Sequence, residues 1–230
     1  YHIDVQRDSR NLIEIPASFH VHLHTNVYYA YVNAKILLAS SKYTAEAGRL
    51  EDKFMQKKIA VINDLSGYGR CSITAALPVL AALKIQCCPV PTSIFSNHTG
   101  FDSYFFEDYT DKMRPYIAEW RKLDLHFNGI CTGFLGSEAQ IGIVGDFLQE
   151  FGGEGTIVLI DPVMGDYGKP YPTYTMEMCL EMKKLVHYAD ILTPNLTEAC
   201  ILTDTPYKEK WRVAEIEQMA EVLSRMGPGK

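Results

Sequence analysis

Two acidic side chains follow apolar, strand-like segments in this sequence of 230 residues. Asp161 comes directly after the run TIVLI, and Pro162 ends that run. Glu198 lies in TPNLTEA, in the first turn of an expected helix that Asn195 or Thr197 would cap. Carboxylate oxygens at neighbouring strand ends are the ligands that Mg²⁺ prefers while it keeps most of its waters. The pair therefore predicts phosphoryl transfer, whereas Glu198 taken alone is a capping acid.

A glycine-containing turn, NDLSGYGRCS, joins the first expected strand to the first expected helix. Its G-x-G-x-x-S pattern lacks the third glycine of a dinucleotide-binding loop, and the next strand offers no acid for a ribose before Asp102. The sequence contains no G-x-x-x-x-G-K-[ST] motif. What remains is a turn whose free amides, together with Asp64 and Ser66, can hold a small polar substrate. Alternatively, Asp64 only caps the turn.

Polar and aromatic residues are interleaved in TSIFSNHTGFDSYFF, residues 92–106. Asn97, His98 and Thr99 form a polar island among aromatic side chains. Such a surface suits a flat heteroaromatic ligand that stacks and forms hydrogen bonds. The alternative for His98 is a structural role beside a turn.

Short apolar runs and helical segments alternate along residues 58–230, which predicts a parallel sheet with helices on both faces. Ligands bind outside the carboxyl ends of the strands in such sheets, so the motifs above would meet at one edge. SEAQ at 137–140 has the form of a capping box, in which Ser137 and Gln140 cap each other. We expect strands at 58–63, 86–91, 127–132, 156–161 and 190–194, and helices at 72–83, 108–122, 138–151, 175–189, from 197, and at 211–226.

Composition points to a small-molecule partner. The chain is 47% hydrophobic, and its net charge of -6 argues against nucleic-acid binding, which needs clustered Lys and Arg. No apolar run approaches the ~20 residues that a membrane span needs. The six cysteines form no C-x-x-C pair and fit small buried thiols in a reducing compartment. We therefore expect a cytoplasmic protein without a nucleic-acid or membrane partner.

The two ends differ from the body of the chain. Regular alternation begins after Met55, so we interpret residues 55–230 as the functional domain and residues 1–54 as an extension of unknown role. His20, His22 and His24 alternate in that extension as possible metal ligands, or as a plain polar strand face. The sequence stops in VLSRMGPGK, where an α/β protein normally continues into a strand, and it reads as truncated at the C-terminus.

Five collinear motifs closely resemble the pyridoxal kinases of the ribokinase-like superfamily: NDLSGYGRCSITAALPVL, FSNHTGF, TGFLGSEAQ, DPVMGD and TPNLTEA. The resemblance covers about residues 57–230, and residues 1–54 have no counterpart. It implies a ribokinase-like α/β fold with a mainly parallel central sheet, and a homodimer. The implied reaction is ATP-dependent phosphorylation of the 5'-hydroxymethyl group of pyridoxal, pyridoxamine or pyridoxine.

The resemblance also implies roles for particular residues at the vitamer end of the site. Thr99 and Gly100 fall on the positions that cover the substrate, and His98 would lie against the pyridine ring. Phe134 stands where relatives often carry a tyrosine, so a ring contact is kept and a hydroxyl is lost. Asp64 stands where many pyridoxal kinases have a serine, and its carboxylate would pair with a protonated ring nitrogen or an aminomethyl group.

At the nucleotide end, the resemblance assigns Asp161, Thr193 and Glu198 to ATP binding. Asn195 and Glu198 form the N-x-x-E motif through which this superfamily organises Mg²⁺ and its waters. The metal would bridge phosphate oxygens and offset the charge that develops during transfer.

The catalytic base of this superfamily is an Asp in a glycine-rich G-[TA]-G-D loop, which this sequence lacks. Relatives carry it past the point that corresponds to Lys230, so we expect no catalytic residue in the chain and little activity from it alone. Two further hypotheses stay open. DLSGYG is also similar to the hydroxymethylpyrimidine kinases of thiamine synthesis, and the chain could be a non-catalytic vitamin-binding fragment.

Overall fold

The structure is a computed structural model that describes residues 12–14 and 56–227. It confirms the predicted α/β class with a mainly parallel central sheet. His20, His22 and His24 lie outside the described residues, as does most of the predicted extension 1–54. No helix among the described residues is long and apolar enough to cross a membrane.

The central sheet has six strands in the order β4-β3-β2-β5-β6-β9. All neighbours pair in parallel except β4, which runs antiparallel to β3 at one edge. After β2, the chain adds β3 and β4 on one side of that strand and then β5, β6 and β9 on its other side. The order in which strands are added therefore reverses between β2 and β5. A crevice for a ligand forms at such a switch point, outside the carboxyl ends of the strands. The strands are β2 (Lys58–Tyr68), β3 (Gln86–Asn97), β4 (Phe106–Asp108), β5 (Gly129–Thr132), β6 (Ile157–Ile160) and β9 (Ile191–Leu192).

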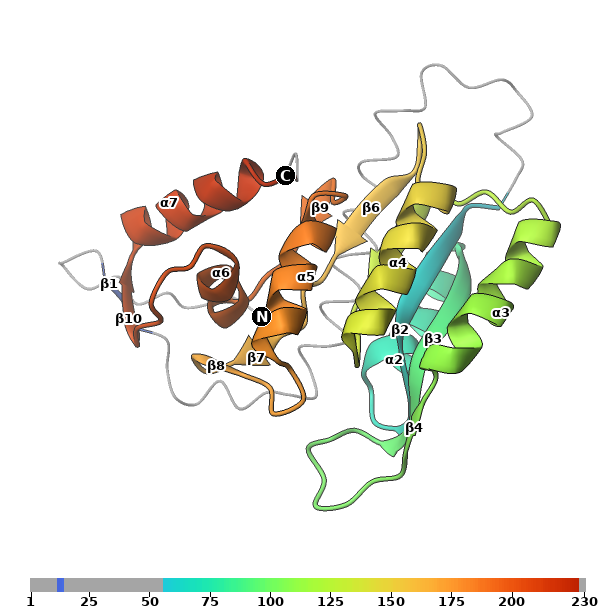
Figure 1. The fold of residues 1–230 in the computed structure, drawn as a ribbon, viewed down its shortest axis with the longest axis horizontal. Coiled ribbons are helices and arrows are strands. Elements are labelled where there is room, and N and C mark those ends of the chain that lie inside the picture. Colours follow the sequence, from blue (N-terminus) through green and yellow to red (C-terminus); the bar gives the residue numbers. More distant parts are fainter. Residues whose placement is uncertain (1–11, 15–55, 228–230) are drawn as a thin grey trace.

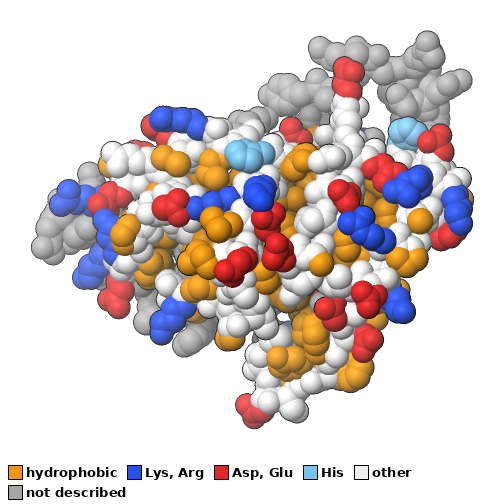
Figure 2. All heavy atoms as spheres, viewed as in Figure 1, with side chains coloured by type: hydrophobic (Ala, Val, Ile, Leu, Met, Phe, Trp, Pro, Cys, Tyr) orange, Lys and Arg blue, Asp and Glu red, His pale blue; other side chains and the backbone are white. Residues whose placement is uncertain are grey.

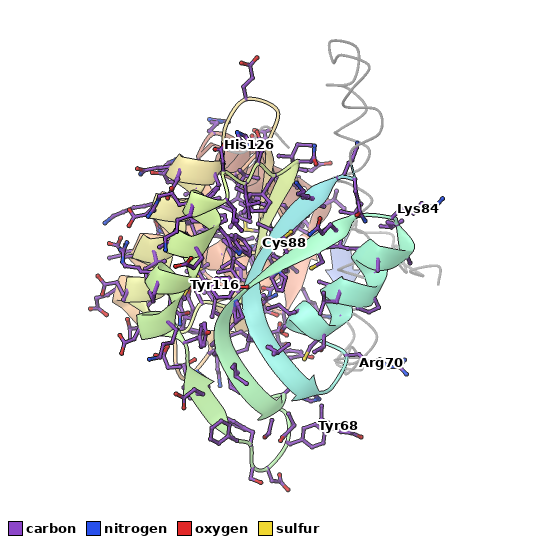
Figure 3. The ribbon with its side chains drawn as sticks, turned by 90° about the vertical axis from the view of Figure 1, so that its right-hand side faces the viewer. Tyr68, Arg70, Lys84, Cys88, Tyr116 and His126 are labelled. Carbon is purple, nitrogen blue, oxygen red and sulfur yellow. The ribbon has the colours of Figure 1, made fainter. Side chains whose placement is uncertain are left out.

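Helices cover both faces of this sheet (Figure 1). One face packs on α2 through residues such as Ile59 and Val61, and the other packs on α3, α4 and α5 through Ala60 and Ile62. This division follows from the alternation of side chains along a strand that is buried on both faces. Figure 3 shows the sheet between α2 and the helices of the other face. These helices are α2 (Ser72–Ala82), α3 (Thr110–Lys122), α4 (Glu138–Phe151) and α5 (Met176–Val186).

Strands β2 and β3 are longer than the sequence predicts. They continue their parallel pairing as far as Tyr68 and Asn97, with a shift of register between Asn63 and Leu65. Much of the expected turn at 63–70 is therefore strand, because β3 offers backbone partners along its whole extension. Figure 3 shows Tyr68 and Arg70 at this end of the sheet, with Lys84 at the far end of α2. The extension carries Asp64 and Ser66 beyond the edge that the shorter strands reach.

The C-terminal part adds smaller elements beside β9. Helix α6 (Leu196–Leu202) and helix α7 (Val213–Ser224) contribute to the same core as α5. A hairpin of β7 (Gly165–Asp166) and β8 (Lys169–Pro170) follows β6. Strand β10 (Lys210–Arg212) pairs antiparallel with β1 (Leu12–Glu14), so this short piece of the N-terminal region lies against the C-terminal part. The sequence alone does not predict these four strands or β4.

Candidate active site

A cavity of about 750 Å³ opens at the carboxyl ends of β2, β3, β5 and β6. A ligand is expected at this edge, because the strand order reverses between β2 and β5. Its walls come from segments that are far apart in the sequence, including the start of α2 and the loops after β3, β5 and β6. Predicted site residues and the turn hydroxyl meet in it: Asp64, Ser66, His98, Thr99, Phe134 and Asp161.

Asp64 is a buried carboxylate in the wall of this cavity, with only 6% of its surface exposed. The Ser66 hydroxyl donates a hydrogen bond of 2.8 Å to Asp64 Oδ2, and the Asp64 N–H donates to Asn63 Oδ1. Burial raises the pKa of Asp64 above its ordinary value, although hydrogen bonds from Ser72 and Ser66 oppose the shift. A buried carboxylate of this kind favours a cation or a strong donor as its partner.

His98 and its neighbours form the outer wall. The Gly100 N–H donates to His98 Nδ1 at 3.1 Å, which leaves the ring proton of a neutral imidazole on Nε2. The imidazole also packs on the ring of Phe101, with 4.6 Å between centroids. A Cβ at Gly69 would lie 2.8 Å from the imidazole, so the glycine of this turn makes room for the ring. His98 and Thr99 line the cavity, and Gly100 orients His98 beside it.

Phe134 is held in the cavity wall by both of its backbone groups. Its N–H donates to Asn63 Oδ1 at 2.9 Å, and its carbonyl accepts from Thr92 Oγ1 at 2.9 Å. These two side chains come from β2 and β3, so the loop after β5 is tied to the neighbouring strands. A Cβ at Gly133 would overlap the Asn63 amide, so the glycine leaves room for the side chain that holds Phe134. Asn63, Thr92 and Gly133 lie in the strand-end segments where the sequence predicts a ligand, but it gives them no role, since only the pairing of the strands brings them together.

Asp161 and Glu198 form an interacting pair of acids. Asp161 lines the cavity, and Glu198 is only 2% exposed. Burial raises the pKa of Asp161, and burial together with the charge of Asp161 raises the pKa of Glu198. Within the described part of the chain, no hydrogen-bond donor or cation contacts the Asp161 carboxylate. The two acids therefore repel one another across a site that a divalent cation would stabilise.

The N-x-x-E residues stand behind Asp161 rather than in the cavity wall. Asn195 and Glu198 form a capping box, in which Asn195 Oδ1 accepts from the Glu198 N–H and Glu198 Oε2 accepts from the Asn195 N–H. Glu198 Oε1 accepts from the Met164 N–H, and Asn195 Nδ2 donates to the Gly165 carbonyl. Thr193 follows β9 next to the strand that Asp161 follows. The motif thus fixes the loop after β6.

The cavity wall contains several acidic side chains. Asp64, Asp108 and Asp161 all line it, and none of its described lining residues is Lys or Arg. Tyr104 and Phe106 add aromatic surface from the loop after β3 and from β4. Sequence reasoning did not single out Asp108 or these two rings, because β4 was not predicted. The cavity is suited to a flat ligand that carries positive charge or a bound metal ion.

The fold and the cavity place the protein among α/β proteins that bind small ligands at the carboxyl edge of a parallel sheet. Residues 68–230 match the phosphomethylpyrimidine kinase family, and the chain belongs to that family. The match, together with pyridoxal kinases among the relatives, confirms the resemblance to pyridoxal kinases of the ribokinase-like superfamily.

Three relatives show the extent of the similarity. A crystal structure of a protein described as a phosphomethylpyrimidine kinase from Bacteroides thetaiotaomicron, in a form with pyridoxal, is 45% identical, with a TM-score of 0.73 over 76% of this chain and 61% of that chain. Pyridoxal kinase PdxY of Deinococcus radiodurans is 30% identical over 65% of this chain and 52% of its own length. The chloroplastic thiamine biosynthetic bifunctional enzyme TH1 of Arabidopsis thaliana is 29% identical over 74% of this chain and 31% of its own length. The chain therefore spans about a third to three fifths of the length of these relatives.

Proposed function

We propose that this chain supplies the vitamer-binding and phosphate-side residues of an ATP-dependent kinase for pyridoxal, pyridoxamine or pyridoxine. The observation that carries the proposal is that Asp64 and Asp161 line one cavity at the carboxyl edge of the sheet. One carboxylate would face the vitamin ring and the other the metal-bound phosphates. The relative from Bacteroides thetaiotaomicron that was solved with pyridoxal supports this ligand class.

At the vitamer end, Phe134 and His98 would flank the pyridine ring, and Thr99 and Gly100 would cover it. Asp64 would accept a hydrogen bond from a protonated ring nitrogen or from the aminomethyl group of pyridoxamine. Such a charge-assisted bond is stronger than a neutral one, and burial removes competing water. Since the cavity wall carries three carboxylates and no Lys or Arg among its described residues, we expect it to favour the cationic vitamer.

At the phosphate end, the donor set fits Mg²⁺, which binds oxygen ligands and keeps several waters. Asp161 offers an acid that no described hydrogen bond or ion pair neutralises. Burial and the charge of Asp161 raise the pKa of Glu198 to about 9, so a bound divalent cation would favour the ionised form of both acids. We propose that Asn195 and Glu198 organise the ion and its waters, and that Asp161, Thr193 and Glu198 hold the nucleotide. Bound Mg²⁺ would offset charge on the transferred phosphate. The residues of this chain bind and orient both substrates in this proposal.

A thiamine-pathway substrate is the alternative. The family to which the chain belongs is that of phosphomethylpyrimidine kinase, and a thiamine biosynthetic enzyme is among its relatives. Hydroxymethylpyrimidine is also a flat, polar heteroaromatic alcohol, and its ring nitrogens and amino group could meet Asp64. A site that binds the vitamer without turnover is the remaining alternative.

The test compares ligands on one protein. Pyridoxal, pyridoxamine, pyridoxine and hydroxymethylpyrimidine are titrated into the chain by calorimetry, and phosphorylated product is then measured with ATP and Mg²⁺. We expect saturable one-to-one binding of the vitamers that is tighter than binding of the pyrimidine. Tighter binding of the pyrimidine would favour the thiamine pathway. We expect little product from this chain, because its sequence lacks the G-[TA]-G-D loop, and rapid turnover would contradict the expectation that this loop supplies the base. Absence of binding by all four compounds to folded protein would refute the proposal.

We also propose that the protein is a homodimer and that it is located in the cytoplasm. Exposed aromatic residues gather around the loop between β3 and β4, with Phe105 exposed by 61% and Tyr68 by 69%. Figure 2 shows this apolar surface on the lobe below the sheet. Edge strand β4 is exposed beside it, and both features favour contact with a second chain. Light scattering after size-exclusion chromatography measures the mass, and a monomer at micromolar concentration would contradict this assembly.

A further inference from the structure

Gln140 is a fully buried polar side chain next to the cavity. It is the third residue of α4, and its N–H donates to Ser137 Oγ at 3.2 Å, as the SEAQ motif predicts. The second half of the predicted capping box is wrong, because the Gln140 side chain does not return to the Ser137 amide. Its amide group instead reaches toward the carboxyl edge of the sheet.

The side-chain amide of Gln140 joins two walls of the cavity. On one side, Oε1 accepts from the Gly136 N–H at 2.7 Å, in the loop that carries Phe134. On the other side, Nε2 donates to the Thr92 carbonyl at 2.8 Å. Nε2 also lies 2.9 Å from Thr110 Oγ1 and 3.1 Å from Asp108 Oδ1, at the corner between β4 and α3. One planar group therefore links the loop after β5 to the middle of β3 and to the end of β4.

The groups that Gln140 contacts border the cavity or hold residues that do. Gly136 and Asp108 both line it. Thr92 uses its hydroxyl to hold the Phe134 carbonyl while its own carbonyl accepts from Gln140, so the two side chains act on the same loop. Thr92 and Gln140 are both fully buried, and water cannot replace these bonds without opening the wall.

We infer that Gln140 is a positioning residue for the ring-binding end of the cavity. It sets the separation between the Phe134 loop and the β4 corner, and so the width of the slot that receives a flat heteroaromatic ring. This inference rests on the proposed function. Binding groups must be held by neighbours whose own positions are fixed, and a small misplacement lowers affinity strongly. Gln140 touches no ligand itself in this account.

The test uses a variant that keeps shape and removes hydrogen bonding. Gln140→Met has a side chain of similar length without the amide. Gln149→Met is the matched control on the same helix, because Gln149 is exposed and its amide donates to the Tyr188 hydroxyl, away from the cavity. Pyridoxal affinity is measured by calorimetry well below the unfolding midpoint of each variant. We expect on the order of ten-fold weaker binding for Gln140→Met and an unchanged affinity for the control.

A second variant reaches the same loop without changing Gln140. Thr92→Val removes the hydroxyl that holds the Phe134 carbonyl. If both side chains act by fixing one loop, the double variant loses less affinity than the product of the two single losses. If Gln140→Met does not fold, Thr92→Val alone tests the inference, because it removes a hydrogen bond to the same loop.

Each outcome has one meaning. A Gln140→Met protein that unfolds at a lower temperature but binds pyridoxal like the wild type has lost only stability, and the inference is then wrong. Equal loss of affinity in Gln140→Met and Gln149→Met also overturns it, as does wild-type affinity in Thr92→Val when Gln140→Met cannot be folded. Wild-type protein that binds none of the vitamers refutes the proposed function, and this inference with it.

Discussion

Replacing Asp64 with Asn tests the ring-binding end of the site most sharply. The substitution keeps the size of the side chain and the hydrogen bond from Ser66, and it removes one buried negative charge. Because only 6% of Asp64 is exposed, a cationic ligand would meet this carboxylate with little water between them. Hydrogen bonds to charged groups contribute about 1.5–3 kcal/mol, and Asp64→Asn should therefore weaken the binding of a cationic vitamer by about 10- to 150-fold.

The assay is a calorimetric titration of pyridoxamine and pyridoxine into wild-type protein, Asp64→Asn and Asp102→Asn. Asp102 lies on the exposed loop after β3 and does not line the cavity, so its variant controls for the change in net charge. Preferential loss of pyridoxamine would place the aminomethyl group at Asp64, and equal loss of both vitamers would place the ring nitrogen there. Unchanged affinity of Asp64→Asn for both vitamers would refute the reasoning.

The same variant has a predicted effect on stability with a defined sign. Burial raises the pKa of Asp64 in the folded chain. The folded chain therefore keeps a proton on this carboxyl group at pH values where the unfolded chain has released it. Stability from this group is then fully present below the unfolded pKa of about 3.9 and is lost as pH rises through the folded pKa. Asp64→Asn should unfold at a higher temperature than the wild type at pH 7, and the gap should close toward pH 4. A gap that widens on acidification would contradict the raised pKa.

Three further predictions concern the walls and the phosphate end. Gly133→Ala should displace the Asn63 amide and lower stability by about 1–3 kcal/mol, measured by urea unfolding; unchanged stability would contradict the tight packing. Asn195→Ala removes the cap of α6 and should cost about 1–2 kcal/mol in the same assay, whereas a neutral effect would exclude a structural role for the capping box. Mg²⁺ should raise the unfolding temperature of the wild type and leave Asp161→Asn unchanged, and an equal rise in both would place the ion elsewhere.

The sequence predicts the elements that depend on local pattern. Helix α4 begins and ends at the predicted residues, because Ser137 caps it and its apolar face is regular. The strands that are apolar on both faces were also predicted, since only a covered parallel sheet accepts them. The prediction of the Asp161 and Glu198 pair followed from the same pattern, because neighbouring parallel strands end at one edge.

The features that the sequence does not predict depend on contacts between distant segments. The extension of β2 to Tyr68 requires β3 as its partner, and its glycines and polar residues look locally like a turn. The bonds of Gln140 to Thr92 and Asp108 span 48 and 32 residues, so no local motif contains them. The substrate roles of His98, Thr99, Gly100 and Phe134 came from resemblance to a family, since their residue types alone also fit a structural role.

A crystal structure of this chain with pyridoxal, ADP and Mg²⁺ tests the account most directly. We expect the pyridine ring between Asp64 and Phe134, and the metal ion with the phosphates beside Asp161 in the same cavity. A ring bound outside this cavity, or a metal ion remote from Asp161, would contradict the account.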